Sequence, residues 1–193
     1  MKKRNNFDNV NNIAKMYIKE VIGEGDVCID ATMGNGYDTV FLAELVGENG
    51  KVYAFDVQEE AIKSTEKKVK KLEFEDRVEL ILDGHENISN YVKDSIKCAV
   101  FNLGYLPRCE HRIKTKPDTT IEAIKQSVAL LEENGVVCVS IYTGHEGGME
   151  ERNAVFDYSA NLGQKEYNVF ESKFINQKNN PPSIILIEKK KQV

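Results

Sequence analysis

Residues 27–56 constrain the fold of this chain more than any other stretch. They read V-C-I-D-A-T-M-G-N-G-Y-D-T, then an apolar segment, then K-V-Y-A-F-D. The pattern predicts a buried strand that ends at Asp30, followed by a tight turn at Gly34 and Gly36. A helix and a second strand, which ends at Asp56, come next. Such a helix begins with free backbone N–H groups at the turn, so this stretch predicts a site for a nucleoside cofactor.

The two acids and the glycine spacing indicate which cofactor this is. Asp56 ends its strand where a carboxylate can accept hydrogen bonds from the two hydroxyls of a ribose. A dinucleotide site has the pattern G-x-G-x-x-G, and its third glycine, counted from Gly34, is Thr39 here. A carboxylate at Asp30 would also repel a pyrophosphate. The pattern D-x-T-x-G-x-G therefore favours S-adenosylmethionine, which has no phosphate and a positively charged amino-acid end, over a nicotinamide cofactor.

The rest of the chain alternates predicted helices and strands. Helices are expected at 10–21, 38–46, 59–71, 88–92, 119–135 and 149–162, and strands at 27–30, 51–56, 78–82, 99–103, 136–142, 167–174 and 183–188. The fifth helix would start at Thr119 with Glu122 as a capping-box pair and end at Gly135. The last two strands have no helix between them and should form an antiparallel hairpin. We therefore expect one α/β domain over residues 1–193, with a Rossmann-like, doubly wound, mostly parallel seven-stranded sheet.

Composition excludes several classes of protein. Hydrophobic residues make up 41% and charged residues 30% of the chain, which is ordinary for a globular protein. No apolar run approaches the ~20 residues that span a bilayer. The first ten residues, M-K-K-R-N-N-F-D-N-V, lack the apolar stretch of a secretory signal. We expect a cytoplasmic protein without membrane contact, whose net charge of −5 gives no global attraction to nucleic acid.

Four motifs carry a resemblance to a known family. They are D-A-T-M-G-N-G-Y-D-T at 30–39, D-G-H-E at 83–86, N-L-G-Y-L-P at 102–107 and Y-T-G-H-E-G-G at 142–148. Through them the chain resembles the class I S-adenosylmethionine-dependent methyltransferases. More narrowly, it resembles the YtqB-like rRNA methylases, a small bacterial family that includes the tRNA methyltransferase MnmM. After L-P this family usually has two glycines and an acid, whereas this chain has Arg108, Cys109 and Glu110.

The resemblance implies a binding site for S-adenosyl-L-methionine. Residues 34–36 would line its methionine end, Asp56 would hold the ribose, and Asp83 and His85 would lie near the adenine. Gln58 either edges the ribose or starts a helix. The full predicted set is Asp30, Met33, Gly34, Asn35, Gly36, Asp56, Gln58, Asp83, His85 and Asn102.

Candidate catalytic residues follow two strands. Asn102 opens N-L-G-Y, which is similar to the N-P-P-Y motif of amine methyltransferases. Its amide oxygen can accept N–H bonds from an amine and aim the nitrogen lone pair at the methyl carbon, although an Asn at this turn can also be structural. An aliphatic amine with a pKa near ~10.4 must lose a proton before it attacks. His145 is our candidate to accept that proton, with Tyr142 positioning the base, although a loop histidine is often structural.

Two other chemistries are conceivable at these loops. A metal could be held by three histidines and three glutamates that follow strands, but their separations match no compact motif, and we expect no metal. These six residues are His85, His111, His145, Glu86, Glu110 and Glu146. Cys109 could add to C6 of a uridine, as C5-methylating enzymes require. Cys28, Cys98 and Cys138 lie in apolar strand-like runs without a C-x-x-C spacing and should be reduced, buried thiols.

A local basic loop predicts RNA binding. Cationic residues surround the expected mouth of the site, and two tyrosines could stack on an unpaired base, although a solvated loop has the same composition. The predicted substrate-binding residues are Tyr105, His111, Arg112, Lys114, Lys116 and Tyr142. The five lysines of 59–71 are interpreted instead as a solvated helix face.

These observations and the resemblance predict an S-adenosylmethionine-dependent RNA methyltransferase. The resemblance alone implies N-methylation of the 5-aminomethyl group of (2-thio)uridine at the tRNA wobble position, with the tRNA anticodon stem-loop as partner. The alternatives are a methyltransferase for rRNA or for a small-molecule amine, and a nucleotide-binding module without catalysis. A homodimer is also expected, because small RNA methyltransferases often need a second subunit.

Overall fold

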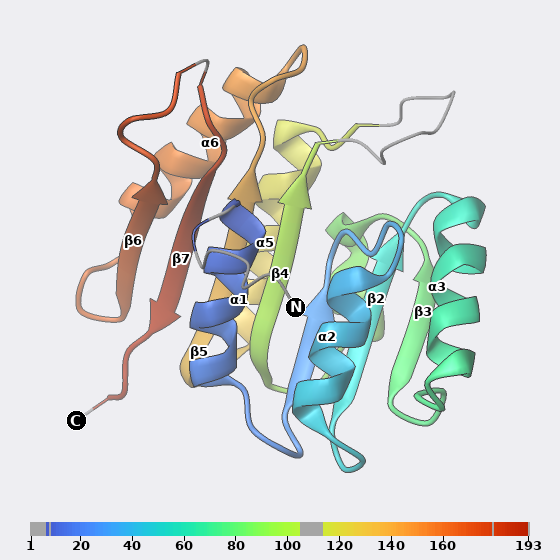
Figure 1. Cartoon of the computed structure of the whole chain (residues 1–193). Coiled ribbons are helices and arrows are strands. Elements are labelled where there is room, and N and C mark those ends of the chain that lie inside the picture. The colour runs from blue at the N-terminus through green and yellow to red at the C-terminus, as the bar shows by residue number, and fades with distance from the viewer. Residues whose placement is uncertain (1–6, 8, 105–113, 179, 193) are drawn as a thin grey trace.

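Seven strands form a single sheet through the part of the chain that the computed structural model describes, which is residues 7, 9–104, 114–178 and 180–192 (Figure 1). The strands are β1 Val27–Asp30, β2 Lys51–Asp56, β3 Val78–Leu82, β4 Ile96–Leu103, β5 Leu131–Ile141, β6 Tyr167–Lys173 and β7 Ser183–Lys189. The helices are α1 Val10–Val21, α2 Tyr37–Val46, α3 Glu59–Lys71, the 3-10 turn η1 His85–Asn87, α4 Ile88–Tyr91, α5 Pro117–Leu130 and α6 Gly148–Ala160.

The order of the strands is β3-β2-β1-β4-β5-β7-β6. Strands β1 to β5 are parallel, while β7 is antiparallel to both β5 and β6. This arrangement confirms the doubly wound sheet and the C-terminal hairpin expected from the sequence. The order of the strands reverses between β1 and β4, and in open α/β sheets ligands bind at the carboxyl ends of the strands at such a point.

Two layers of helices bury the two faces of the sheet. Helices α1 and α2 pack against the face that contains Cys28, Cys98 and Cys138, and α5 and α6 pack against the face that contains Ile29 and Phe101 (Figure 1). Successive strand residues point to opposite faces, so both faces are apolar, as a sheet covered on both sides requires.

The boundary between α5 and β5 differs from the expectation. Helix α5 begins at Pro117, and its N-cap is Lys116, which forms no side-chain cap. Thr119 therefore lies inside the helix, where its Oγ1 donates to the Lys116 carbonyl at 3.1 Å. The predicted capping box of Thr119 and Glu122 is wrong. The helix ends at Leu130, because Leu131 is buried in β5 opposite Ile96. Gly135 is therefore a strand residue rather than a helix cap.

A bulge explains the glycine at position 135. The register shifts between the Ile96–Leu131 and Cys98–Val136 pairs, so β5 has extra residues there. A Cβ at Gly135 would lie 3.0 Å from the carbonyl oxygen of Lys97. The close approach of two backbones, and not the end of a helix, requires glycine here.

Cys28, Cys98 and Cys138 are free and buried, as predicted. Burial raises the pKa of the Cys138 thiol to about 12, so it stays protonated at neutral pH. Cys109 lies outside the described residues. Among those residues, none of the helices has the length and apolar character to cross a bilayer.

The burial of these thiols predicts how they react. In a Cys109→Ser variant, we expect no rapid reaction with a thiol reagent under native conditions, because Cys28, Cys98 and Cys138 expose at most 2% of their surface. All three should react once the protein is unfolded in denaturant. Colorimetric thiol titration of native and unfolded protein measures this, and one rapidly labelled thiol in the native variant would contradict the described packing.

Candidate active site

Strands β1 and β4 are joined beyond their last shared pair by the segment that follows β1. The Ala31 N–H donates to the Val100 carbonyl at 2.9 Å, and the Asn102 N–H donates to Thr32 Oγ1 at 2.7 Å. The predicted cofactor turn and the predicted catalytic Asn102 are therefore held together by direct contacts. The site is centred at the reversal of strand order.

The glycine turn is packed tightly against α3. Gly36 has a φ of +74°, and a Cβ there would lie 2.5 Å from Thr65 Oγ1, so only glycine fits. Thr65 Oγ1 donates to the Gly34 carbonyl at 3.2 Å, and Ser64 Oγ donates to Asn35 Oδ1 at 3.2 Å. Gly36 is also the N-cap of α2 and offers no side-chain cap, so a ligand can bind the first N–H groups of this helix.

Asp56 connects this turn to the start of α3. Its Oδ2 accepts from the Gly34 N–H at 2.9 Å, and its Oδ1 accepts from the Gln58 N–H at 3.0 Å. Burial raises the pKa of this carboxyl group, while the two backbone hydrogen bonds lower it. The Gln58 side chain is also within hydrogen-bonding range of this carboxyl group, and a carboxylate has about four acceptor positions, so room remains for a further hydrogen bond. Gln58, predicted either to edge the ribose or to start a helix, is the N-cap residue of α3 and forms no side-chain cap. Met33, also in the predicted set, is buried, and its N–H donates to the Phe55 carbonyl at 2.9 Å.

Asp30 is fully buried beneath the turn. Its Oδ2 accepts from the Thr39 hydroxyl at 2.7 Å, and its Oδ1 accepts from the Thr32 N–H at 3.2 Å. Burial, together with the nearby carboxylate of Asp38, raises its pKa to about 7. Thr39, which stands where a dinucleotide site has its third glycine, therefore supplies a hydrogen bond to this buried acid. A contact between Asp30 and the amino group of the cofactor stays a prediction.

The two residues expected near the adenine differ in burial. Asp83 accepts from Asn87 Nδ2 at 2.9 Å and from the Tyr91 hydroxyl at 2.9 Å, and the Asn87 bond is the main cause of its lowered pKa. His85 is buried, and its Nδ1 lies 3.1 Å from the Ala31 carbonyl, so this nitrogen carries the proton. Burial lowers the pKa of His85, so its ring is neutral. Its Nε2 is buried without a partner among the described residues.

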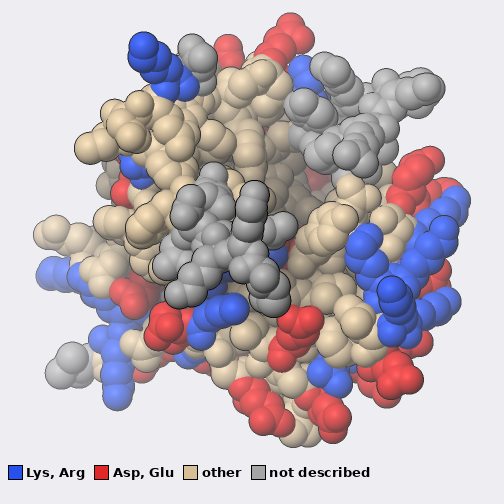
Figure 2. Space-filling model, viewed as in Figure 1, with Lys and Arg blue, Asp and Glu red and all other residues tan. Residues whose placement is uncertain are grey.

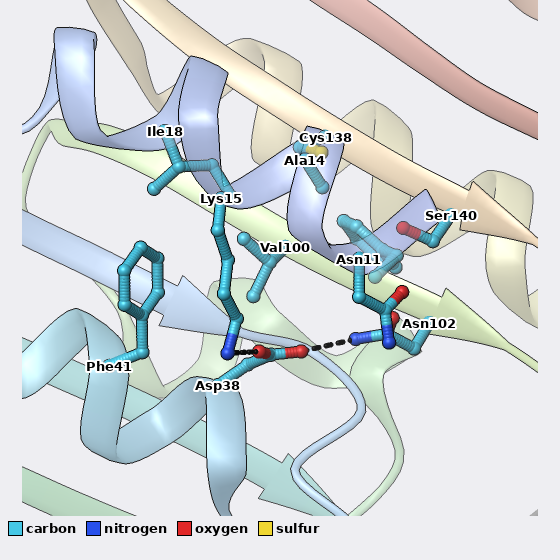
Figure 3. Close-up of a pocket in the computed structure, with 11 residues that line it drawn as sticks. Asn11, Ala14, Lys15, Ile18, Asp38, Phe41, Val100, Asn102, Cys138 and Ser140 are labelled. Carbon is cyan, nitrogen blue, oxygen red and sulfur yellow. Dashed lines mark hydrogen bonds and ion pairs between the residues drawn. The ribbon is translucent and has the colours of Figure 1, made fainter. Parts of the chain in front are cut away.

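Asn102 is bound through its side chain as well as its backbone. Its Nδ2 donates to Asp38 Oδ2 at 2.8 Å, and Asp38 Oδ1 lies 2.7 Å from Lys15 Nζ (Figure 3). These residues line a pocket between α1, α2 and the ends of β4 and β5, which also includes Ser140. Sequence reasoning missed both Lys15 and Asp38.

Tyr142 and His145 follow β5 but face different neighbours. The Tyr142 hydroxyl donates its proton to Asn11 Oδ1 of α1 at 2.7 Å. The His145 ring lies near the end of β4, because a Cβ at Gly104 would be 3.8 Å from His145 Cε1. A Cβ at Gly148 would be only 2.9 Å from the same atom. The structure thus brings His145 to the end of β4, and the role of Tyr142 in positioning the base stays a prediction.

The predicted basic loop is described only at its C-terminal end. Lys114 Nζ lies 3.3 Å from the Glu146 carbonyl oxygen and 3.6 Å from its carboxylate, so it connects the segments after β4 and β5. Lys116 is exposed at the start of α5. Tyr105, His111 and Arg112 lie outside the described residues.

The lysines of α3 gather at one side of the molecule (Figure 2). Lys63 pairs with Glu59 at 2.9 Å and Lys70 pairs with Glu66 at 2.7 Å, each one helical turn apart. Such pairs are typical of a solvated helix surface, in agreement with the interpretation of the sequence.

A buried acid that sequence reasoning missed holds the start of α5 and the residue Thr115 that precedes it. Glu151 of α6 is 1% exposed and accepts from the Thr115 hydroxyl at 2.8 Å and the Thr120 hydroxyl at 2.6 Å. Thr115 also forms two hydrogen bonds with Gly104. The Gly104 N–H donates to Thr115 Oγ1 at 3.0 Å, and the Thr115 N–H donates to the Gly104 carbonyl at 3.0 Å. The spacing to the buried Val155 could have placed Glu151 on the inner side of α6.

The metal alternative requires a cluster of ligating side chains. Within the described ranges, no three His, Cys, Asp or Glu side chains are placed to hold a metal ion. Of the histidines that this alternative requires, His111 lies outside those ranges.

Comparisons with known proteins identify relatives of this chain. A family described as "Putative rRNA methylase" matches residues 52–188. A "putative rRNA-methylase" from Clostridium thermocellum has a crystal structure with 46% sequence identity and a TM-score of 0.92, covering 95% of this chain and 98% of that one. A "putative methyltransferase" from Streptococcus mutans, solved in complex with SAH, has 40% identity and a TM-score of 0.86, covering 98% and 99%.

A plant relative has a named reaction. The chloroplastic tRNA (mnm(5)s(2)U34)-methyltransferase of Arabidopsis thaliana is 30% identical over 187 residues, which is 92% of this chain and 68% of that protein. Together with the solved structures, this match confirms the predicted family and its class I methyltransferase fold.

The raised pKa of Asp30 makes a prediction about stability. Because the folded protein holds a proton on Asp30 up to a pKa of about 7, while an unfolded aspartate releases it near 3.8, raising the pH between these values favours unfolding. Relative to Asp30→Asn, the wild-type free energy of unfolding should fall by at most about 1.4 kcal/mol per pH unit. It should level off above pH ~7.

Urea unfolding of both proteins at several pH values measures this difference. The altered hydrogen bonds of the Asp30→Asn variant add an offset that does not depend on pH, so only the slope matters. A constant difference across the whole range would contradict a protonated, buried Asp30.

Proposed function

The chain belongs to the "Putative rRNA methylase" family, and we propose that its methyl acceptor is the 5-aminomethyl group of a (2-thio)uridine at the tRNA wobble position. The enzyme is an S-adenosylmethionine-dependent methyltransferase. The observation that most supports an amine acceptor is the side chain of Asn102, whose Nδ2 is bound to Asp38. Its amide oxygen accepts no hydrogen bond from the described residues, so it is available to an N–H group. The name of the Arabidopsis relative supports the wobble uridine.

The residues of the glycine turn fit the cofactor. The uncapped N–H groups of α2 suit its carboxylate, and the remaining lone pairs of Asp56 suit the ribose hydroxyls. His85 is proposed to lie near the adenine, with its Nδ1 bound to the Ala31 carbonyl beside the turn; its Nε2 is enclosed by protein and has no partner in the described chain. When bound, S-adenosylmethionine supplies a methyl group on a positively charged sulfur, which keeps the electron pair of the broken bond.

Two residues would then act on the acceptor. The amine is mostly protonated near neutral pH, since its pKa resembles the ~10.4 of lysine, and it must lose one proton to expose its lone pair. His145 lies close enough to the end of β4 to take that proton directly or through water. The Asn102 oxygen would accept a remaining N–H bond and aim the lone pair at the methyl carbon.

The RNA partner is proposed to be the tRNA anticodon stem-loop, bound beside the segments after β4 and β5. Lys116 is exposed there, and its charge would contact the phosphate backbone. We propose a cytoplasmic location as well. The homodimer stays a prediction.

An rRNA acceptor is the second candidate, because the description of the family names rRNA. The test is to incubate the enzyme and labelled cofactor separately with tRNA that carries 5-aminomethyl-2-thiouridine, with rRNA, and with small amines. We expect nucleoside mass spectrometry to find one added methyl group on the tRNA wobble nucleoside. Label that appears only in rRNA or in the small amines would overturn the proposed acceptor.

His145→Ala should slow methyl transfer without weakening cofactor binding. The loss expected for a general base is about 10²-fold or more in the single-turnover rate. This loss in rate should become smaller as the pH rises, because the amine then loses its proton to solvent. Quenched single-turnover assays at saturating cofactor measure the rate, and calorimetry with S-adenosylhomocysteine checks cofactor affinity. An unchanged rate would remove His145 from the reaction.

Lys116→Glu should weaken tRNA binding several-fold at low salt, because a phosphate contact is replaced by repulsion. Lys125→Glu is the matched control, since it makes the same charge change at an exposed position of α5 about 13 Å further along the helix. Lys114 is avoided because its contact with Glu146 would be disturbed as well. Equal tRNA affinities for both variants, with unchanged cofactor affinity, would argue against RNA binding at this edge.

A further inference from the structure

We propose that Lys15 and Asp38 are positioning residues, which hold the Asn102 side chain with its amide oxygen toward the acceptor amine. Lys15 comes from α1, Asp38 from α2 and Asn102 from the end of β4, so three separate elements meet at this point (Figure 3). The inference rests on the proposed amine acceptor.

The contacts form a chain through both oxygens of one carboxylate. Lys15 Nζ lies 2.7 Å from Asp38 Oδ1, and Asn102 Nδ2 donates to Asp38 Oδ2 at 2.8 Å. The Lys15 and Asp38 side chains are only 30% and 21% exposed, and the Lys15 ammonium lies 4.7 Å from the centre of the Phe41 ring. This pair is therefore better shielded from solvent than an ordinary surface ion pair.

The charge on Asp38 decides which way the amide faces. A carboxylate can only accept hydrogen bonds, so the Asn102 NH₂ group must face it and the amide oxygen must point elsewhere. The Asn102 backbone is fixed as well, because its N–H donates to Thr32 Oγ1 at 2.7 Å. With the backbone held and the NH₂ group engaged, the position of the oxygen follows.

This orientation matters for an amine acceptor. A flipped amide would offer N–H groups to the nitrogen lone pair, which would hold that lone pair away from the methyl group. When the amide oxygen faces the amine, it instead accepts a hydrogen bond from an N–H of the amine and leaves the nitrogen lone pair free. The orientation of one amide thus separates a productive complex from an unproductive one.

Lys15 has a second effect on the same chemistry. Without a cation beside it, the Asp38 carboxylate would attract the ammonium form of the acceptor and make its deprotonation harder. Asp38 also acts on Asp30 of β1, Cys138 of β5 and Tyr142 after β5, raising the pKa of each. None of these three groups carries a positive charge, whereas Lys15 Nζ lies 2.7 Å from Asp38 Oδ1 and balances its charge.

The variants are Asp38→Asn, which leaves an amide that can present either of its ends to Asn102, and Lys15→Met, which removes only the charge. For Asp38→Asn we expect kcat to fall about 10- to 100-fold, with KM for tRNA and affinity for S-adenosylhomocysteine unchanged. For Lys15→Met we expect the pH at half-maximal kcat to rise by about one unit. Lys19→Met is the matched control, because Lys19 also lies over Phe41, at 5.7 Å, without an ion pair to Asp38.

A second measurement does not depend on activity. In spectra of protein labelled with ¹⁵N-asparagine, the Asn102 NH₂ signals of the wild type should show the hydrogen bond to a carboxylate, and Asp38→Asn should shift them. Unchanged signals, or a wild-type kcat in Asp38→Asn, would overturn the positioning role. A wild-type enzyme that methylates no amine at all would overturn the proposed function, while the spectra would still decide the orientation of Asn102.

Discussion

The hydrogen bonds to the buried carboxyl group of Asp30 hold the rest of the site in place. Thr32, which donates its N–H to Asp30, also accepts the Asn102 N–H, and Thr39, which donates its hydroxyl, belongs to the helix that carries Asp38. A single interior acid thus fixes the end of β1, the glycine turn and the start of α2 relative to β4. This arrangement buries Asp30 completely, and burial disfavours the charged form of the acid and raises its pKa to about 7.

The two sides are built from different elements. The proposed cofactor side consists of β1, β2 and the glycine turn, while the proposed acceptor side consists of α1, the end of β4 and the segment after β5. Because Asn102 and Asp38 lie where the two sides meet, the orientation of one side chain can be adjusted for a new acceptor without altering the turn. This separation agrees with a fold that many methyltransferases share while their acceptors differ.

The C-terminal ends of the strands and the doubly wound topology could be predicted from the sequence, because an apolar run followed by an acid or a glycine indicates where a buried strand ends. Asp30, Asp56 and the glycine turn were recognised in that way. The α5–β5 boundary could not, since the pairing of Leu131 with Ile96 is a tertiary contact that overrides the glycine signal at Gly135. Lys15, Asp38 and Glu151 were missed because a charged residue on a helix is usually interpreted as solvent-facing, and their partners lie far away in the sequence.

The hydrogen bonds around Glu151 and Thr115 join three elements at one edge of the molecule. Two hydrogen bonds connect Gly104 with Thr115. The Thr115 hydroxyl also donates to Glu151, which belongs to α6. The end of β4, the start of α5 and the interior of α6 are thus joined by polar contacts that use no side chain from positions 105–113. A substitution at those positions leaves all the donors and acceptors of this connection in place.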